Sequence, residues 1–292
     1  MRKVLLFGIV ILTGACFIGR LFYLQIYESS AYDLNNDNAI RKVFHYPKRG
    51  YIYDRNDSLL VANQPSYDVM VIPREVETID TIMFCDLLKI EKHDFLKYYN
   101  RAKRYSPRLP SVLLPHLSKE DYAFLSEKLR KFKGFYIQKR SVRDYQTSIG
   151  ANVLGYIAEA NSKDIKKDAY YRLGDLIGKQ GVEVSYEKTL RGVKGVKYIQ
   201  KDIYNRDIGA YKEGAFDTLP IPGKDLNITI DSELQAYGEL LMQNKIGGIV
   251  AIEPSSGEIL SLVSAPSYNP NLLVGRQRSK NYTKLYLDSI HR

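Results

Sequence analysis

The sequence predicts an α+β protein in three parts: an N-terminal membrane-spanning helix, an external α+β region, and the opening elements of a second domain. Three observations predict it. An apolar run fills residues 4–18, short strand-like and helix-like segments alternate from residue 47 onward, and Pro220-Ile221-Pro222-Gly223 marks a boundary. Hydrophobic residues make up 45% and charged residues 26% of the chain, which argues against disorder over the whole length.

The apolar run favours a membrane anchor. Residues 4–18 read VLLFGIVILTGACFI, and the apolar character continues to residue 24 with Arg20 as its only charge. A helix over residues 4–23 would be about 30 Å long, which matches the hydrocarbon core of a bilayer. Because Arg2 and Lys3 precede the run, the positive-inside rule places the N-terminus in the cytoplasm and the bulk of the chain outside.

Two alternatives compete with an uncleaved anchor. Thr13-Gly14-Ala15-Cys16 is close to a lipoprotein cleavage site, but Thr13 stands where leucine is usual. A cleaved signal peptide is the second alternative, although apolar residues run on past any small-residue cleavage site. We therefore predict a retained single-pass anchor.

The segments that follow the anchor alternate in type. Residues 24–41 continue as a helix of increasing polarity, which Pro47 ends. Residues 51–53 and 59–61 are strands joined by a turn at residues 54–58. Residues 118–131 are a helix, with Ser118 as cap and acids in the first turn.

The second half of the chain repeats this alternation. Residues 150–156 and 178–190 each carry a compact helical signal, and residues 192–196 form a turn before a strand that runs to residue 203. Beyond the boundary we expect a strand at residues 225–230 and a helix at residues 233–243, capped by Asp231 and Ser232. Residues 249–252 and 258–263 then form a hairpin of two apolar strands.

Charge and composition exclude several functions. The formal charge is +10, but Lys and Arg are scattered from Arg2 to Arg292 without a clustered binding motif, so we expect no nucleic-acid partner. Cys16 lies in the apolar run, which predicts that it forms no disulfide with Cys85, itself expected to be buried in a helix. No metal-ligand spacing joins the four histidines, so we predict neither a metal site nor a cofactor.

Five segments of the sequence carry a family resemblance. The first is Pro47-Lys48-Arg49-Gly50-Tyr51-Ile52-Tyr53-Asp54-Arg55-Asn56. The others are Val153-Leu154-Gly155-Tyr156-Ile157, then Gly178-Lys179-Gln180-Gly181-Val182-Glu183 with Tyr186-Glu187 and Leu190-Arg191-Gly192, then Thr229-Ile230-Asp231-Ser232-Glu233-Leu234-Gln235, and finally Glu253-Pro254-Ser255-Ser256-Gly257-Glu258-Ile259-Leu260 with Ser267-Tyr268-Asn269-Pro270-Asn271. In this order they resemble class B penicillin-binding proteins, most closely the elongation type, penicillin-binding protein 2, and the first is similar to the family pattern R-G-x-I-x-D-R-N.

The resemblance implies an organisation and a function. It implies a cytoplasmic tip and anchor over residues 1–26, a pedestal or dimerisation domain over residues 27–223, and the start of a β-lactamase-like transpeptidase domain over residues 224–292. The whole protein would be a peptidoglycan D,D-transpeptidase in the bacterial inner membrane that cross-links cell-wall peptides during elongation and maintains cell shape. Its partners would be peptidoglycan precursor peptides, the membrane, a SEDS-type glycosyltransferase and other elongation-complex proteins.

The chemistry of that family needs groups that this chain lacks. A serine nucleophile must be followed one helical turn later by a lysine that takes its proton, and S-x-N and K-S/T-G elements must line the site. The only S-x-x-K is Ser185 with Lys188, which lies in the pedestal and is expected to be a solvated helix face; Ser267-Tyr268-Asn269 is a loop, and no K-S/T-G occurs. We therefore expect no catalytic residue in this chain, which would be a fragment ending before the nucleophile.

Two motifs remain as candidate sites. Arg49, Gly50, Asp54 and Arg55 form either a surface turn with ordinary ion pairs or a buried polar cluster that fixes the first pedestal hairpin, with Gly50 needed where another backbone approaches. The resemblance favours the cluster. A second candidate, either structural or partner-binding, comprises Gly178, Gly181 and Glu183.

A function of another class is a membrane-anchored cell-envelope scaffold that acts by protein contact and ends near residue 292. The apolar hairpin at residues 249–263 argues against it, because two strands with an apolar face normally need a completed sheet. The nucleotide sequence downstream separates the two: an open frame that soon encodes S-x-x-K indicates a fragment, whereas a stop codon indicates the scaffold.

Overall fold

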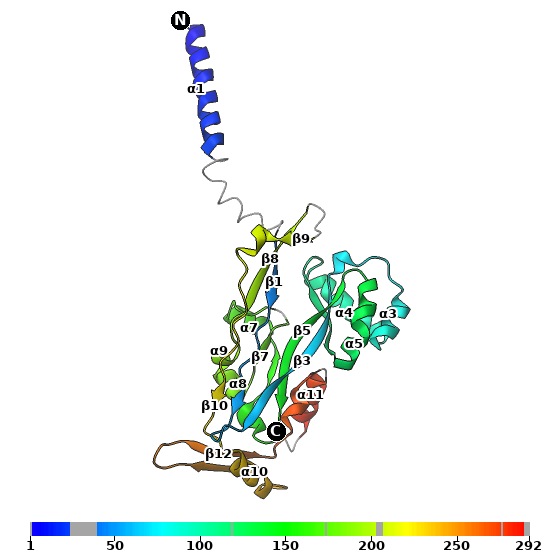
Figure 1. The fold of residues 1–292 in the computed structure, drawn as a ribbon, viewed down its shortest axis with the longest axis vertical. Helices are drawn as coiled ribbons and strands as arrows, with labels where there is room; N and C mark the ends of the chain where they lie inside the picture. Colours follow the sequence, from blue (N-terminus) through cyan, green and yellow to red (C-terminus); the bar gives the residue numbers. More distant parts are fainter. Residues whose placement is uncertain are drawn as a thin grey trace. The chain divides into compact units, whose positions relative to one another are not determined.

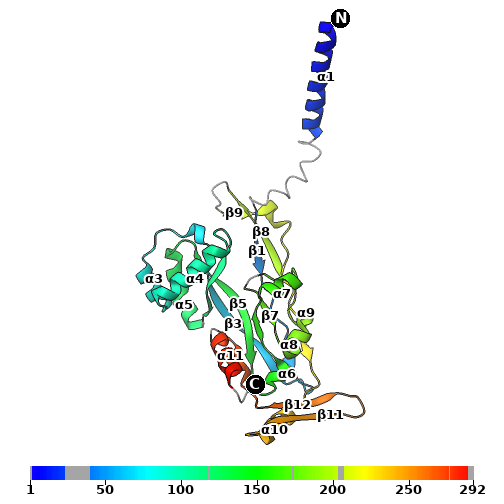
Figure 2. The same ribbon diagram turned by 180° about the vertical axis from the view of Figure 1, so that it is seen from behind.

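The computed structural model describes residues 2–23, 40–117, 119–172, 174–202, 207–275 and 277–288. Contacts divide the chain into two compact units. Unit 1 comprises residues 1–45 and 194–220, and unit 2 comprises residues 46–193 and 221–292 (Figures 1 and 2). The predicted domain limits at residues 26 and 223 stay predictions.

Within its described residues, unit 1 contains helix α1 and a small sheet. Helix α1 (Arg2–Phe22) covers the apolar run, and strands β1 (Ile40–His45), β8 (Gly195–Lys201) and β9 (Asp207–Ala210) form an antiparallel sheet in the order β1-β8-β9. A single 3₁₀ turn, η4 (Tyr211–Gly214), follows β9. Across the described residues, no helix has both the length and the apolar character that crossing a membrane requires.

The sheet of unit 1 corrects one prediction. Residues 40 and 41 were expected at the end of a helix, but both lie in β1, where Ile40 pairs with Gln200 and Arg41 with Ile199. The rest of that predicted helix, residues 24–39, lies outside the described residues. Pairing with a strand more than 150 residues away decides the conformation here, because strand formation depends on its partner more than on local propensity.

The centre of unit 2 is a sheet built around one long strand. β3 (Leu59–Val71) pairs antiparallel with β5 (Phe135–Tyr145) from Val61 opposite Tyr145 to Val71 opposite Phe135. On its other edge β3 pairs first with β2 (Ile52–Tyr53) and then with β4 (Ser111–Leu117), and β10 (Leu226–Asn227) lies parallel to β2. The two strands predicted around residues 54–58 are confirmed, whereas the strand predicted at residues 225–230 is only two residues long.

A helical subdomain lies at one end of β3 and β5 (Figure 1). It contains α3 (Thr81–Leu88), α4 (Lys92–Tyr105) and α5 (Lys119–Lys128), with 3₁₀ turns η2 (Pro73–Glu75) and η3 (Leu129–Lys131). The Phe84 ring is central to its core, with ring centroids 5.3 Å from Phe95 and 4.4 Å from Phe135. Cys85 is buried in α3, as predicted, and α5 confirms the predicted helix from residue 119 on, since Ser118 lies outside the described residues.

Short elements cover the other end of the central sheet. They are α6 (Ala151–Leu154), β6 (Ile157–Glu159), α7 (Ser162–Lys167), β7 (Leu176–Gly178), α8 (Gly181–Ser185) and α9 (Glu187–Leu190). β6 and β7 pair with each other, and the helical signals predicted at residues 150–156 and 178–190 are confirmed as α6, α8 and α9. Ile52, Val61 and Leu190 are fully buried in the core between these elements and the sheet.

The last part of unit 2 contains α10 (Ser232–Leu241), a hairpin of β11 (Gly247–Ile252) and β12 (Ile259–Ala265), the 3₁₀ turn η5 (Pro270–Leu273) and α11 (Arg278–Leu287). The predicted helix and hairpin are therefore confirmed. The Asp231 side chain caps α10 by accepting a hydrogen bond from the Leu234 backbone N–H. Gln235 is buried under β12, where its Oε1 accepts from the Ser261 hydroxyl and the Leu262 N–H.

Candidate functional site

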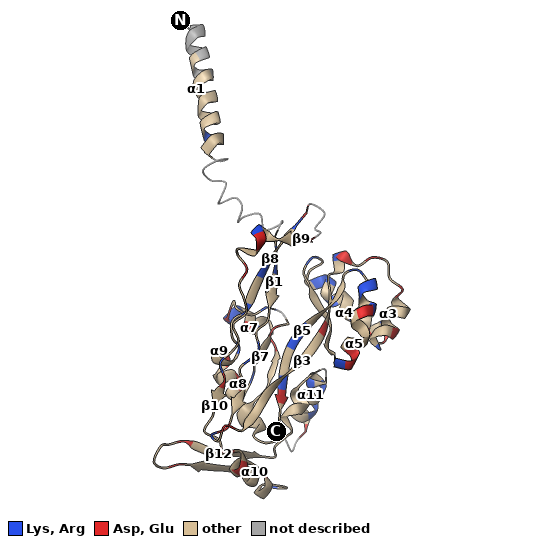
Figure 3. Cartoon of the chain, viewed as in Figure 1, with Lys and Arg blue, Asp and Glu red and all other residues tan. Residues whose placement is uncertain are grey.

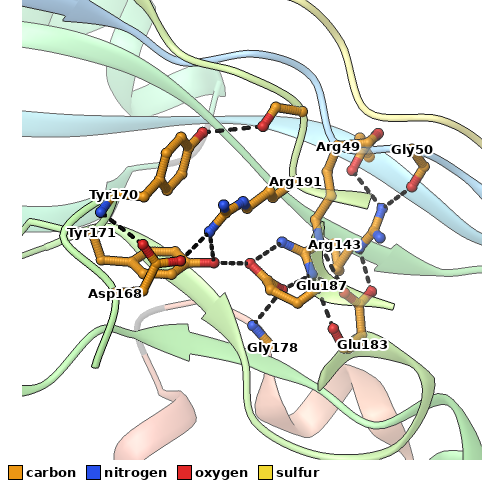
Figure 4. Close-up of polar contacts among 12 residues, drawn as sticks. Arg49, Gly50, Arg143, Asp168, Tyr170, Tyr171, Gly178, Glu183, Glu187 and Arg191 are labelled. Atoms are coloured by element: carbon orange, nitrogen blue, oxygen red, sulfur yellow. Dashed lines mark hydrogen bonds and ion pairs between the residues drawn. The ribbon is translucent and has the colours of Figure 1, made fainter. Parts of the chain in front are cut away.

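A buried network of charged side chains lies where the chain enters β2 (Figure 4). The guanidinium of Arg49 binds two carboxylates from the helices α8 and α9. Its Nε donates to Glu183 Oε2 at 2.8 Å, and its terminal nitrogens donate to both oxygens of Glu187. Arg143, on β5, donates from its Nε to Glu183 Oε1 at 2.6 Å. Glu183 thus lies between two arginines.

Backbone groups and neutral side chains complete the network. Arg143 also donates to the Gly50 carbonyl at 2.7 Å and to Asn63 Oδ1 at 3.0 Å. The Tyr171 hydroxyl donates to Glu187 Oε1 at 2.7 Å, and the Gly178 N–H donates to Glu187 Oε2 at 2.9 Å. Each buried carboxylate therefore has several donors, which a buried charge needs to offset the loss of its hydration.

The electrostatics follow from burial and pairing. Burial alone would lower the pKa of Arg49, but the carboxylates of Glu183 and Glu187 outweigh it and raise that pKa above its ordinary value. For Arg143 burial dominates and lowers the pKa, although Glu183 opposes it. Burial would raise the pKa of Glu187, but the hydrogen bond from Arg49 outweighs it and lowers the pKa. Arg49 and Glu187 thus hold each other in the charged form.

The network continues outward through Arg191. Its guanidinium donates to the Tyr171 hydroxyl at 2.8 Å and to Asp168 Oδ2 at 2.9 Å, and it lies 3.8 Å from the centre of the Tyr170 ring. Asp168 keeps a lowered pKa through hydrogen bonds from the Tyr170 N–H and Arg191. A chain of polar contacts therefore runs from the partly exposed Asp168 to the fully buried Glu183.

All three glycines of the predicted sites lie where no side chain fits. A Cβ on Gly50 would be 1.9 Å from the Lys224 carbonyl oxygen, and one on Gly178 would be 2.2 Å from the Glu183 carbonyl oxygen. Gly181, the first residue of α8, has φ of +59° and would meet the Val153 carbonyl oxygen at 2.2 Å. These close backbone approaches are the physical reason for glycine at all three positions.

Asp54 lies at the other end of β2, in a second cluster. Its Oδ1 accepts from the N–H groups of Asn56 and Ser58 at 2.8 and 2.7 Å. Its Oδ2 accepts from the Ser232 hydroxyl at 2.6 Å, at the first residue of α10. Burial would raise the pKa of Asp54, but the hydrogen bonds from Ser232, Ser58 and Asn56 lower it.

Arg49, Asp54 and Arg55 were predicted to share one buried polar cluster, and this is wrong because each contacts different partners. Arg49 precedes β2 and Asp54 follows it, so the strand separates their side chains. Arg55 is about one-third exposed and lies 3.7 Å from Glu258, which makes it a weak surface pair. The motif thus supplies two buried contacts, one with α8 and α9 and one with α10.

Several residues of the network were not predicted. Arg143 and Tyr171 come from segments without a recognised motif, and Glu187 and Arg191 lie in a recognised motif but were not singled out. The signal for Arg143 was available: it occupies a position of β5 between Val142 and Tyr145, both buried, where a charge needs a partner.

The charged groups of this arrangement bind one another, and the S-x-x-K pair lies outside it. Ser185 and Lys188, the only S-x-x-K pair, are exposed and lie in α8 and α9, two helices separated at Tyr186. In the part of the chain that the structure describes, no group of three or more His, Cys, Asp or Glu side chains could hold a metal ion. The geometry is that of a structural junction between β2, β5, α8, α9 and α10.

The penicillin-binding protein dimerisation domain matches residues 44–228, which include the buried network of Arg49 and Glu183 and the Asp54 carboxylate, and the chain therefore belongs to this family. The peptidoglycan D,D-transpeptidase MrdA of Acinetobacter baumannii is 35% identical over 285 residues, and that of Salmonella typhimurium is 32% identical over 300 residues. These matches cover 95% and 98% of this chain but only 42% and 47% of the relatives, so the chain spans less than half of their length.

The fold is also that of a solved relative. Penicillin-binding protein 2 of Helicobacter pylori, in its complex with MreC, aligns with a TM-score of 0.71 and 25% sequence identity. The alignment covers 86% of this chain and 48% of that chain. The predicted mixed α+β fold of a pedestal region is thereby confirmed.

Proposed function

We propose that this chain is the anchor and pedestal part of a peptidoglycan D,D-transpeptidase of the penicillin-binding protein 2 type, which cross-links cell-wall peptides during elongation. The observation that carries the proposal is the alignment with transpeptidases named MrdA over 95% of the chain. The network of Arg49, Glu183 and Arg143 supports a structural role for this region, since its charged groups are largely buried and paired with one another.

The hairpin at the end of unit 2 supports the same proposal over a free-standing scaffold. Among the described strands, β11 and β12 pair only with each other. Val250 and Ile252 of β11 and Leu240 of α10 are more than half exposed. Two strands with apolar residues on an open face are marginal alone. They fit the first strands of a larger transpeptidase sheet, whose substrates would be peptidoglycan precursor peptides.

The proposal is tested by covalent labelling with a fluorescent penicillin. The full-length protein encoded by the continuous reading frame is expected to give a labelled band on a denaturing gel, because a serine ester survives denaturation. Residues 1–292 alone are expected to give none, because Ser185 and Lys188 are exposed to solvent and lie in separate helices. An unlabelled full-length protein would contradict the proposal, and a band from the short chain that Ser185→Ala abolishes would make Ser185 the nucleophile.

Membrane attachment is the second part of the proposal. We propose that α1 anchors the chain in the inner membrane with the N-terminus inside, because Arg2 and Lys3 precede the apolar run. A phosphatase reporter fused after residue 30 is expected to be active, and a cytoplasmic fluorescent reporter at the same place inactive. The reverse pattern would refute this topology. An MreC-type protein and a SEDS-type glycosyltransferase are the partners that the family favours.

A further inference from the structure

An aromatic turn follows β9 in the sheet of unit 1. The ring centres of Tyr211 and Phe216 lie 5.8 Å apart, and the Lys212 Nζ lies 5.5 Å from the first and 5.9 Å from the second. Phe216 is 46% exposed, and Ile208 of β9 is 63% exposed. These four residues are called the aromatic turn below. They gather two rings, an ammonium group and an aliphatic side chain on one short segment.

The backbone of this turn has an unusual conformation that its neighbours hold in place. Lys212, Glu213 and Gly214 follow one another with φ of +44°, +57° and +84°. Residues with a side chain rarely adopt left-handed φ, so other contacts must fix it. The Asp217 N–H donates to the Gly214 carbonyl at 2.9 Å, and Asp217 Oδ1 accepts from the Tyr198 N–H of β8 at 2.8 Å. The turn is thereby fastened to the sheet.

The register of the sheet places the aromatic turn at the end that the chain enters from α1. Ile40, the first residue of β1, pairs with Gln200, and β9 pairs with residues 199–201 of β8. His45 pairs with Gly195 at the opposite end of β1, about 17 Å away at about 3.4 Å per residue. Residues 24–39 join α1 to Ile40, and a stretch of that length spans at most about 55 Å.

Charge does not distinguish this end of the sheet. Within residues 40–45, 194–202 and 207–220, six Lys or Arg are mixed with four Asp or Glu (Figure 3). Asp207 binds Arg41 at 2.5 Å and lies 3.6 Å from Lys201. The small positive excess does not repel anionic lipid headgroups, but attraction to a surface must come mainly from the aromatic and aliphatic side chains.

The side chains of the aromatic turn fit the boundary between lipid headgroups and acyl chains. Tyr211 combines an apolar ring with a polar hydroxyl, as the residues enriched at that boundary do. Lys212 lies beside two rings, and a lysine in the boundary keeps its ammonium among the headgroups. Phe216 and Ile208 supply apolar surface for shallow insertion. A short connection to an anchored helix keeps this surface at a high effective concentration near the bilayer.

We propose that the aromatic turn is a second membrane contact, which inserts shallowly into the outer leaflet of the bilayer that holds α1. This inference rests on the membrane attachment of α1 proposed above. It goes beyond that attachment, because it assigns a lipid contact to a part of the chain outside the anchor. Two attachment points restrict the tilt of the sheet relative to the membrane, which a single point does not.

The test uses the absence of tryptophan from this sequence, which makes one engineered indole the only emitter of its kind. Residues 1–292 with Phe216→Trp are reconstituted into vesicles of phosphatidylcholine and phosphatidylglycerol, with plain or brominated acyl chains. Bromine quenches an indole that touches it, and we expect emission at least about twofold lower in the brominated vesicles. Phe124→Trp is the matched control and is expected to show no quenching. Phe124, in unit 2, is 50% exposed and has the Lys128 Nζ 3.6 Å from its ring centre.

A second pair of variants tests the position of the contact. In the Phe216→Trp chain, Ile208→Asp places a carboxylate in the contact and is expected to remove at least about half of the quenching at an unchanged melting temperature. Leu219→Asp changes a residue that is 87% exposed and follows Thr218, which pairs with Val196 toward the opposite end of the sheet, and it is expected to leave the quenching intact.

The outcomes separate the contact from the anchor. A Phe216→Trp chain that floats with the vesicles in a density gradient but is not quenched would overturn the proposal. Equal quenching in the Phe216→Trp and Phe124→Trp chains, or quenching that Ile208→Asp leaves intact, would overturn it as well. A chain that does not float with the vesicles would refute the attachment through α1, and the second contact with it.

Discussion

Replacing Glu183 by glutamine is expected to lower the free energy of unfolding by about 3–5 kcal/mol. Glu183 is fully buried and lies between Arg49 and Arg143, and its loss of charge leaves Arg143 without a carboxylate. Arg49 keeps Glu187, so the damage is centred on Arg143. Thermal unfolding of residues 40–292 is expected to show a melting temperature lower by about 10 °C.

Two further variants make this result specific. Glu127→Gln changes an exposed glutamate of α5 in the same way and is expected to alter stability by no more than about 0.5 kcal/mol. The double variant Glu183→Leu with Arg143→Met removes both buried charges and is expected to recover part of the loss. If Glu183→Gln melts within about 2 °C of the wild type, the network does not stabilise the pedestal.

Replacing Asp54 by alanine is expected to cost about 2–3 kcal/mol and to flatten the acid dependence of stability. The N–H groups of Asn56 and Ser58 and the Ser232 hydroxyl lose their acceptor. Because the folded state lowers the pKa of Asp54, its contribution is present above the unfolded pKa of about 4 and is lost as the pH falls through the folded value.

The measurement is urea unfolding of the wild type and Asp54→Ala between pH 7 and pH 3. The difference between the two proteins is expected to be largest at neutral pH and to shrink in acid. Ser232→Ala, which removes one donor of the same contact, is expected to show a smaller effect of the same sign. A difference that is constant with pH would mean that Asp54 acts through packing and not through its charge.

The sequence correctly predicted the helices and hairpins that depend on neighbouring residues alone. The helix α10 follows from the Asp231 cap and its apolar spacing, and the hairpin of β11 and β12 follows from two apolar runs around residues 253–258. The failure at Arg41 has the opposite cause. Its strand exists because β8 lies beside it, and no feature of residues 24–41 indicates that pairing.

In the candidate site, likewise, the sequence identified single residues but not the contacts between them. The resemblance singled out Arg49, Gly50 and Glu183, but it could not show that Arg49 and Glu183 bind each other. Arg143 was not predicted because its role depends on the fold. Its side chain, on β5, donates a hydrogen bond to a carboxylate of α8, and only the folded chain brings the two together. Pairings between distant segments are set by three-dimensional packing, which a single sequence does not reveal.

The number of residues between the two partners of each buried contact limits how early that contact can form during synthesis. Glu183 is synthesised 134 residues after Arg49, and Ser232 is synthesised 178 residues after Asp54, so neither contact can form before then. At a synthesis rate of about 5–20 residues per second, the second interval lasts about 10–35 s. The helical subdomain of α3, α4 and α5 is complete within a short stretch of chain and can form early. β2 gains its second neighbour, β10, only after Leu226 has been made. Until then one edge of β2 stays unpaired in the growing chain, and an unpaired strand edge is the kind of surface that a chaperone protects from wrong pairing.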